Sequence, residues 1–459
     1  MLEQLLSYEY KEIVKERWTT VTKRTHKIIY REVDFNGVTG LETFQGMWFR
    51  VTEALKKAGI PYTWSDQRDP RPAPRLDLMY GFWHKQEELT RKTLEFGYSG
   101  KCEIVTRYGK TACQLNIFRA NPGLPAVWLA PGSDILDQNF KAAKEQLIGR
   151  DVKMIGGFSR TKVPSDDITV CSMDSMHHLD PDRTRTIVID EAHELPTTSR
   201  IPVFARFNRA RIYGYSGSML GRFDGRDIIT EGLIGPTIVR KTYLEALAEG
   251  AVCEMKVIFL HIPLDVAKIP GGNRHTVYNT VLRKNTECVE MIRFLCDQVI
   301  PADKQTLIFI HHEEQADMIY NALGGDTRIG MAKVLTDKER AALTKSMKLD
   351  ELKRCVASDI FSTGITFSQL GVVLNVAGGG GSISCVQKPG RLLQPMKGKR
   401  CGVMFEFMFT EKVPGATGEA KALITDSMAR QRVYHSKGYT LLHANSVAEV
   451  EKIYRAECL

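Results

Sequence analysis

The sequence predicts an α/β protein in which helices flank parallel β-sheets, and three observations support this fold class. Thr186–Ile189 is a run of β-branched residues followed by two carboxylates, a pattern typical of a buried parallel strand that ends at a polar edge. Upstream, a strand-like stretch is followed by a turn with Gly109-Lys110-Thr111 and then by a helical stretch. Further strand-like segments, separated by helical ones, lie between and after these two features. We therefore expect a doubly wound sheet with a ligand site at the carboxyl ends of its strands.

Length and composition are those of a soluble globular protein. The chain has 459 residues, of which 43% are hydrophobic and 25% charged, which is enough for two or three domains. Its formal net charge of +9 favours a polyanionic partner. No apolar run is long enough to cross a bilayer and the N-terminus has no signal-peptide pattern, so we expect no membrane association. The 10 cysteines are scattered singly without zinc-ligand spacing, which predicts reduced thiols in a cytoplasm and no zinc site.

Residues 1–75 are expected to form a small α+β domain. Lys27–Val33 is typical of a strand, and Asn36-Gly37 after it is a turn signal. Met47–Lys57 has helical periodicity. The proline-rich run Asp69–Arg75 excludes regular structure and marks the boundary to the next unit. This domain either contacts nucleic acid or only packs on the rest of the protein.

A candidate phosphate-binding loop opens the second unit, which we expect to span residues 76–250. Helix Gln86–Leu94 and a short strand Glu103–Thr106 come first, and the segment Arg107-Tyr108-Gly109-Lys110-Thr111 then leads into a helix. In this context a Gly-Lys-Thr sequence holds phosphate oxygens with backbone N–H groups and the helix N-terminus. Lys110 would then reach the β and γ phosphates of a nucleotide, and the Thr111 hydroxyl would join a Mg²⁺ shell.

Two carboxylates end the strand Thr186–Ile189. Asp190 could hold a Mg²⁺ ion, and Glu191 could orient and deprotonate a water molecule. The alternative is an acidic helix N-cap after a core strand, because Asp and Glu favour that position as well. Lys110 and Asp190 are 80 residues apart (190 − 110 = 80), which leaves space for two or three βα units between them. Expected strands in and after this interval are Ala126–Pro131, Asp167–Ser172 and Arg211–Ser218.

These motifs together resemble those of a superfamily 2 helicase or translocase of the Asp-Glu-Ala-His kind, in order from Gln86 to Arg391. Gln86 resembles the adenine-reading glutamine, Gly109–Thr111 motif I, Ala130-Pro131 motif Ia, Gly156-Gly157 motif Ib and Thr169–Ser172 motif Ic. Asp190–His193 resembles motif II, and Ser216–Ser218 takes the place of motif III. Beyond a linker near residues 248–254, Thr306–Ile310 resembles motif IV, Val356–Ile365 motif V and Gln387–Arg391 motif VI.

The resemblance implies two tandem RecA-like domains, residues 76–250 and 251–459, which bind ATP and Mg²⁺ and act on nucleic acid. It implies catalytic roles for Lys110, Asp190, Glu191, His193, Gln387 and Arg391. Nucleotide-binding residues would be Gln86, Arg107, Tyr108, Gly109, Lys110, Thr111 and Gly364, with Thr111 and Asp190 holding Mg²⁺. Nucleic-acid contacts, mostly to phosphates, would come from Pro131, Gly156, Gly157, Thr169, Ser172 and Thr363. Ser216, Gly217 and Ser218 would couple hydrolysis to movement through His193.

The chain departs from the family pattern at two positions. Arg107 stands where these phosphate-binding loops usually carry a glycine. Because a non-glycine residue resists positive φ, we expect the loop to be shaped differently there. Arg107 either contributes charge to the phosphates or points to solvent. Gln394 stands where motif VI often ends in a further arginine, so Arg391 alone would contact the γ phosphate.

The N-terminal residues narrow the resemblance further. Thr43–Met47, Ala58–Tyr62 and Asp66–Arg68 are similar to the small leading domain of phage branch-migration helicases of the UvsW kind and of the T-five-like phages. This implies a monomeric DNA helicase in the host cytoplasm that remodels forks or Holliday junctions in recombination, replication or repair. Two other classes stay open, namely an RNA-dependent ATPase and a weakly hydrolysing nucleic-acid clamp.

Overall fold

The chain folds into two compact units, one of residues 1–12 and 22–242 and the other of residues 13–21 and 243–459. The predicted boundary at residue 75 lies inside the first unit. Among the described residues, no helix combines the length and the apolar character needed to cross a bilayer. The computed structural model describes residues 2–16, 19–35, 37–66, 68, 70–222, 224–265, 276–277, 279–310, 312–331, 335–358, 367–377, 387–396, 398–412 and 418–459.

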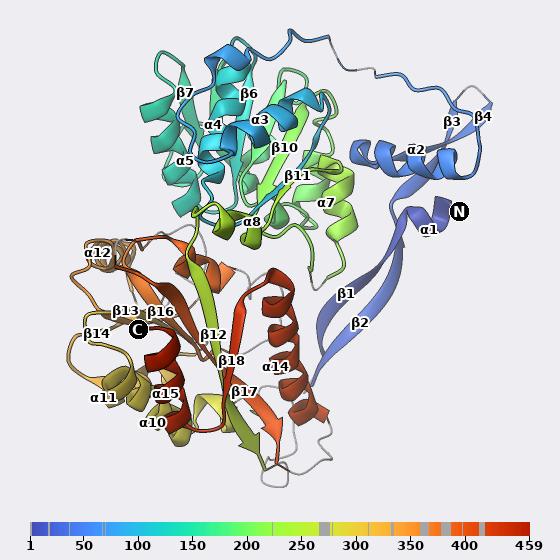
Figure 1. Ribbon diagram of the computed structural model, residues 1–459. Helices are drawn as coiled ribbons and strands as arrows, with labels where there is room; N and C mark the ends of the chain where they lie inside the picture. The colour runs from blue at the N-terminus through green and yellow to red at the C-terminus, as the bar shows by residue number, and fades with distance from the viewer. Residues whose placement is uncertain are drawn as a thin grey trace. The chain divides into compact units, whose positions relative to one another are not determined.

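A parallel sheet of seven strands forms the centre of the first unit, with helices flanking it (Figure 1). Its strand order is β11 (Thr237–Lys241), β5 (Gly100–Ile104), β10 (Arg211–Ser216), β9 (Thr186–Ile189), β6 (Ala126–Ala130), β8 (Ile168–Ser172) and β7 (Val152–Ile155). The central strands are buried along their length because helices shield the sheet from solvent. The helical segments are α3 (Gln86–Glu95), α4 (Lys110–Ala120), α5 (Ser133–Gln146), η3 (Met173–His178), η4 (Ala192–Glu194), α6 (Arg200–Phe204) and α7 (Asp227–Ile234).

The N-terminal segment, apart from residues 13–21, belongs to this first unit. Its elements are α1 (Leu2–Leu5), β1 (Ser7–Glu16), β2 (Thr19–Ile28), β3 (Tyr30–Phe35), β4 (Val38–Thr43), η1 (Gln45–Met47), α2 (Trp48–Lys57) and η2 (Leu76–Leu78). Met47 is fully buried in the same hydrophobic core as the sheet. A Cβ on Gly46 would lie 2.2 Å from the carbonyl oxygen of Glu231 in α7, so the two backbones approach too closely for a side chain. The Arg50 guanidinium donates to both carboxylate oxygens of Glu231, at 2.9 and 3.0 Å.

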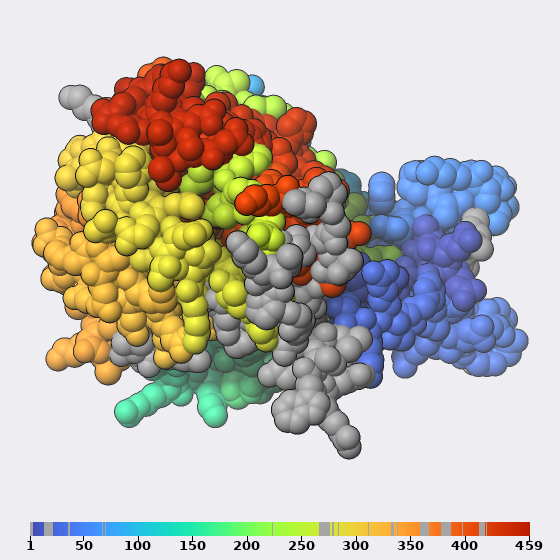
Figure 2. All heavy atoms as spheres, turned by 90° about the horizontal axis from the view of Figure 1, so that it is seen from below, coloured from blue at the N-terminus to red at the C-terminus, as the bar shows by residue number. Residues whose placement is uncertain are grey.

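The second unit also has a seven-stranded parallel sheet. Its order is β14 (Thr327–Gly330), β15 (Arg354–Ala357), β13 (Gln305–Phe309), β16 (Leu370–Asn375), β17 (Cys401–Glu411), β12 (Glu254–Leu264) and β18 (Thr440–Ala444). The helices are α8 (Tyr243–Ala248), η6 (Asn279–Arg283), α10 (Thr286–Phe294), η7 (Leu295–Val299), α11 (Glu313–Leu323), α12 (Asp337–Lys348), η9 (Arg391–Leu393), α14 (Gly418–Lys437) and α15 (Val447–Glu457). The C-terminal helix α15 contacts η7, and the red C-terminal helices adjoin the yellow α10 and η7 segment in Figure 2.

This architecture confirms the predicted fold class of α/β with two tandem RecA-like doubly wound sheets, and the predicted small α+β N-terminal domain is a β-rich region. Two predicted elements were misplaced. The strand expected at Glu103–Thr106 is β5, Gly100–Ile104, because the chain already turns at Val105 toward the phosphate-binding loop. The strand expected at Lys27–Val33 is divided between β2 and β3. β3 and β4 pair as an antiparallel hairpin, and the predicted turn falls between them. Asn36 of its turn lies outside the described residues.

Candidate nucleotide site

The loop between β5 and α4 has the backbone shape of a phosphate-binding loop. The Tyr108 N–H donates to the carbonyl of Val105 at 3.3 Å, which closes a turn, and Lys110 is the first residue of α4. Gly109 has φ of 92°, and a Cβ there would lie 2.3 Å from the side-chain nitrogen of Gln86. Only glycine fits this position, where both the φ angle and the close approach exclude a side chain.

Arg107 overturns the expectation that a non-glycine residue would force a different loop shape. Its φ is 74°, in the left-handed region that glycine usually occupies. Such a conformation costs about 1–3 kcal/mol for a non-glycine residue and persists only where the surroundings impose it. Burial lowers the pKa of the Arg107 guanidinium to about 10. The side chain is therefore still charged at neutral pH, beside the candidate phosphate site.

Arg107→Gly tests whether that charge serves the nucleotide. We expect ATP affinity to fall about tenfold, the effect of one lost charge-assisted hydrogen bond, while the thermal midpoint stays level or rises as the strained φ is relieved. Arg107→Lys retains a charge and is the matched control. Isothermal titration with ATP and Mg²⁺ measures the effect, and equal or tighter binding by Arg107→Gly would contradict the charge role.

Gln86 has a structural role that the sequence did not reveal. It is buried at the start of α3, and its Nε2 donates to the Tyr108 carbonyl at 2.6 Å. Its Oε1 accepts from the Trp83 N–H at 2.9 Å. The Gln86 amide thus ties the phosphate-binding loop to the segment that precedes α3, and adenine reading by this residue stays a prediction.

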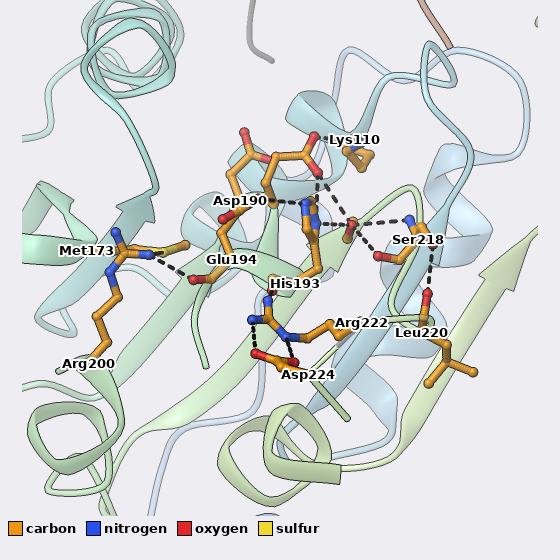
Figure 3. Close-up of polar contacts among 12 residues, drawn as sticks. Lys110, Met173, Asp190, His193, Glu194, Arg200, Ser218, Leu220, Arg222 and Asp224 are labelled. Atoms are coloured by element: carbon orange, nitrogen blue, oxygen red, sulfur yellow. Dashed lines mark hydrogen bonds and ion pairs between the residues drawn. The ribbon is translucent and has the colours of Figure 1, made fainter. Parts of the chain in front are cut away.

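The two acidic residues lie directly opposite the loop, at the carboxyl end of β9. Lys110 Nζ lies 3.3 Å from Glu191 Oε1. Asp190 is 9% exposed, and its two carboxylate oxygens accept from the amides of Gln114 at 3.0 Å and Asn139 at 3.4 Å. Figure 3 shows Lys110 and Asp190 converging from the two elements. The acidic N-cap alternative does not describe this site, because neither carboxylate caps η4.

The pKa values of the two carboxylates are shifted in opposite directions. Burial, followed by the neighbouring Glu191 charge, raises the pKa of Asp190. Burial alone would raise the pKa of Glu191. The charges of Lys110 and His193, together with hydrogen bonds from Lys110 and Ser216, outweigh this effect, so the pKa is lowered. The lowered pKa keeps Glu191 ionised at neutral pH, so it can accept a proton. A cation beside Asp190 would stabilise the charged form of its carboxylate.

His193 connects the acidic motif to the end of β10. It is 1% exposed, and its Nδ1 lies 2.8 Å from Ser216 Oγ. Ser216 Oγ in turn donates to the Ser218 carbonyl at 3.0 Å and reaches Glu191 Oε2 at 3.4 Å. A Cβ on Gly217 would lie 2.8 Å from Thr106 Oγ1, so this turn also packs against the loop that follows β5. The structure thus brings motifs I, II and III together at one edge of the sheet, as the sequence predicts (Figure 3).

Two arginines that the sequence analysis missed hold this region. Arg222 donates to the His193 carbonyl at 2.6 Å and pairs with Asp224 at 2.8 Å. Arg200 donates to the Glu194 carbonyl at 2.8 Å and pairs with Asp174 at 2.7 Å. Both bonds run to backbone atoms of the acidic segment, so no local sequence signal distinguishes these arginines from surface residues.

Four of the six residues predicted to contact nucleic acid, Pro131, Gly156, Gly157 and Ser172, lie at or after the carboxyl ends of other strands of the same sheet. Pro131 follows β6, and Gly156 and Gly157 follow β7 with φ of 98° and 57°. Ser172 ends β8 and caps η3 by accepting from the Asp174 N–H at 3.4 Å. Thr169 is wrongly predicted, because its side chain is 1% exposed inside β8 and its hydroxyl accepts from the Ser165 N–H at 2.9 Å.

The second unit holds motif VI. Gln387 and Arg391 lie in consecutive helical segments, and Arg391 is buried. Between them, Lys388 Nζ donates to Asn375 Oδ1 at 2.9 Å, and Asn375 Nδ2 donates to the fully buried Glu406 at 2.7 Å. This network anchors motif VI on the sheet, a role for Lys388 that its sequence position did not indicate. Thr363 and Gly364 of motif V lie outside the described residues.

The residues of the first unit fit a magnesium-bound nucleotide. Mg²⁺ takes one or two carboxylates together with phosphate oxygens and water rather than a cage of protein ligands. Among the described residues, no cluster of three or more His, Cys, Asp or Glu side chains could hold a metal by itself. Asp190 would supply the carboxylate and Thr111, the second residue of α4, the hydroxyl. Gln114 donates to Asp190 through its side-chain nitrogen, and its side-chain oxygen is buried without a hydrogen-bond partner.

The protein resembles several solved structures in fold, at low sequence identity. The chain matches no protein-family model and no curated protein sequence. A variant of S. cerevisiae Dbp5 bound to RNA and ADP BeF3 has a TM-score of 0.56 at 15% identity, covering 81% of this chain and 92% of that chain. The ATP-dependent Type ISP restriction-modification enzyme LlaBIII bound to DNA has a TM-score of 0.59 at 12% identity, covering 82% of this chain and 32% of that chain. A putative HsdR subunit of a type I restriction enzyme from Vibrio vulnificus has a TM-score of 0.56 at 15% identity, covering 89% and 76%. The chain therefore shares with these proteins the fold of two tandem RecA-like domains.

Proposed function

We propose that this protein is a nucleic-acid-stimulated ATPase of superfamily 2 that moves along and remodels branched DNA. The observation that carries the proposal is the juxtaposition of Lys110, in a phosphate-binding loop, with the Asp190–Glu191 pair at 3.3 Å. A lysine at a helix N-terminus faces a metal-binding acid and an ionised base, which is the set that phosphoryl transfer to water needs. The similarity to structures holding RNA or DNA supports a nucleic-acid partner.

The ion pair between Lys110 and Glu191 suggests how the site is activated. Nucleotide phosphates would compete for the Lys110 ammonium, because they carry more negative charge than one carboxylate. Glu191 would then be released to accept a proton from the attacking water. A Mg²⁺ ion held by Asp190 and Thr111 would supply charge stabilisation at the phosphates. In this proposal Lys110 switches between its carboxylate partner and its phosphate partner in each cycle.

The His193–Ser216 bond is proposed to couple that cycle to movement. Ser216 contacts both His193 and Glu191, so a movement of the Glu191 side chain would alter the contacts at the end of β10. We expect His193→Ala and Ser216→Ala each to leave ATP turnover within about tenfold of wild type, as neither group acts on the phosphate. DNA remodelling per ATP should fall much further. Parallel measurement of phosphate release and junction migration tests this, with His177→Ala as control, and equal losses in both readouts would contradict coupling.

The motif VI residues are proposed to complete the site from the second unit. By the family resemblance, Gln387 and Arg391 would act on the γ phosphate, and Gln394 leaves Arg391 as the only arginine of the motif for this role. The buried link from Lys388 to Asn375 would hold this segment in place. Thr363, Gly364, Pro131, Gly156, Gly157 and Ser172 stay predicted contacts to nucleic acid or nucleotide.

Branched DNA as the substrate rests on the N-terminal resemblance, and RNA is the second candidate because a Dbp5 structure with the same fold holds RNA. Steady-state ATPase rates with no nucleic acid, single-stranded DNA, a four-way DNA junction and RNA test the proposal. We expect the junction to stimulate most. Greatest stimulation by RNA would move the protein to the RNA-dependent class, and no turnover in any arm would leave a nucleic-acid clamp.

A further inference from the structure

A cavity of about 380 Å³ lies on the first unit, between the start of α2 and the loops that precede β5 and β10. Three aromatic side chains gather there. The ring centroids of Trp48 and Trp64 are 5.1 Å apart, those of Trp48 and Tyr98 are 5.1 Å apart, and Trp64 and Tyr98 meet edge to face at 6.5 Å. Trp64 is 48% exposed, so its ring faces solvent as well as its neighbours.

Arginines surround the aromatic rings. The Arg68 guanidinium lies 5.4 Å from the centre of the Tyr98 ring, and it makes a two-pronged ion pair with Asp66 at 2.9 and 2.7 Å. Arg209 lines the same cavity and is half exposed, with Asp182 no closer than 3.9 Å. Positive charge and aromatic surface thus occupy one site.

The half-buried Arg71 shows that several cations lie close together at this edge of the sheet. It donates to the Arg209 carbonyl at 3.2 Å and to Thr186 Oγ1 at 3.3 Å. Its pKa is lowered to about 10, chiefly by burial and further by the charges of Arg211, Arg68 and Arg185. A cationic ligand would be repelled here, whereas an anion with a flat ring system would be attracted.

The cavity is separate from the candidate nucleotide site. Ser99 and Asn208 precede β5 and β10, so the cavity lies at the amino ends of the strands. Lys110, Glu191 and Ser216 lie at or after the carboxyl ends of the same sheet. A five-residue strand separates the two edges by about 16 Å, so one mononucleotide cannot fill both.

We propose that this cavity is a second nucleic-acid site, which holds an unpaired base of a strand against Trp48, Trp64 and Tyr98 while Arg209 and Arg68 face its phosphates. Stacking on aromatic rings accepts any base, and arginine contacts to phosphate carry no sequence information. Unpaired bases occur where a duplex branches, so the site would engage the substrate at its junction. The inference rests on the proposed function only for the choice of a nucleic acid as ligand.

Binding of a fluorescein-labelled oligo-dT by the full-length protein, without ATP, tests the proposal by anisotropy. We expect Trp64→Ala to weaken binding about tenfold, the effect of losing one stacked base. Trp64→Phe retains a ring and should keep most of the affinity. Arg209→Gln should weaken binding and flatten the salt dependence, while Arg91→Gln, an exposed arginine of α3 paired with Glu87, should change neither.

An abasic strand makes the test independent of any folding defect. It keeps the phosphates but lacks the bases, so wild type should bind it about as weakly as Trp64→Ala binds oligo-dT, and Trp64→Ala should lose nothing further. If Trp64→Ala binds oligo-dT as tightly as wild type, the aromatic cluster only packs α2 and the proposal fails. Binding of thymidine monophosphate but not of the strand would also overturn it. Because no ATP is present, failure of the proposed ATPase would not alter these results.

Discussion

Lys110→Ala is expected to lower nucleic-acid-stimulated ATP turnover by about 100- to 1,000-fold, the usual effect of removing one preorganised charge from a transition state. Lys110 is 11% exposed and has Glu191 at 3.3 Å, so its ammonium is already held where phosphates would bind. The substitution removes the charge and leaves Glu191 beside the phosphates without its partner. Phosphate release at saturating DNA measures the effect.

The same variant should keep most of its DNA affinity, because the proposed phosphate contacts to DNA come from other residues. Lys141→Ala is the matched control, since Lys141 is an exposed lysine of α5 that pairs with Asp137 at 2.6 Å. Wild-type turnover by Lys110→Ala, with the control unchanged, would show that the loop after β5 does not hold the reacting phosphates.

Glu191→Gln is expected to bind ATP at least as tightly as wild type and to hydrolyse it about 100- to 10,000-fold more slowly, because the amide cannot accept a proton from water. Binding should not weaken, since the substitution removes the carboxylate that competes with phosphate for Lys110. The lowered pKa of Glu191 adds a pH prediction. This shift belongs to the nucleotide-free protein, in which Lys110 pairs with Glu191, so it should appear in kcat/KM: kcat/KM for ATP should persist on acidification below the range where an ordinary glutamate base would be protonated.

Single-turnover hydrolysis and ATP titration separate the two effects of this substitution. Glu103→Gln is the control, as Glu103 belongs to the same sheet but pairs with Arg240 at 2.8 Å. Normal hydrolysis by Glu191→Gln would show that another group activates the water.

Local sequence patterns sufficed for the elements that form the centre of the site. A β-branched run ending in Asp190 and Glu191, and a Gly-Lys-Thr turn before a helix, each carry their structure within a few residues, and β9 and α4 lie where they were predicted. The edge strands β7 and β11 were not predicted, since four- and five-residue segments with mixed burial give no clear periodicity.

Features that depend on contacts between distant residues could not be predicted. Gln86 meets the Tyr108 carbonyl across 22 residues, and no local pattern marks this contact. The link between His193 and Ser216, across 23 residues, followed only from the family resemblance. Arg107 has a φ of 74°, which the preferences of arginine do not predict. Thr169 was misplaced for a related reason: its motif marks a sheet edge, but the residue itself lies within the buried strand.

The proposed function requires that the loop after β5 and the acidic pair after β9 form a single Mg·ATP site. A structure determined with Mg²⁺, ADP and beryllium fluoride tests it most directly. We predict that a fluoride, which takes the place of a γ-phosphate oxygen, lies within hydrogen-bonding distance of Lys110 Nζ. The Mg²⁺ should lie beside Asp190 and Thr111, and Glu191 should turn from Lys110 toward the attacking water. A nucleotide bound elsewhere, or one that leaves the Lys110–Glu191 pair intact, would contradict the claim.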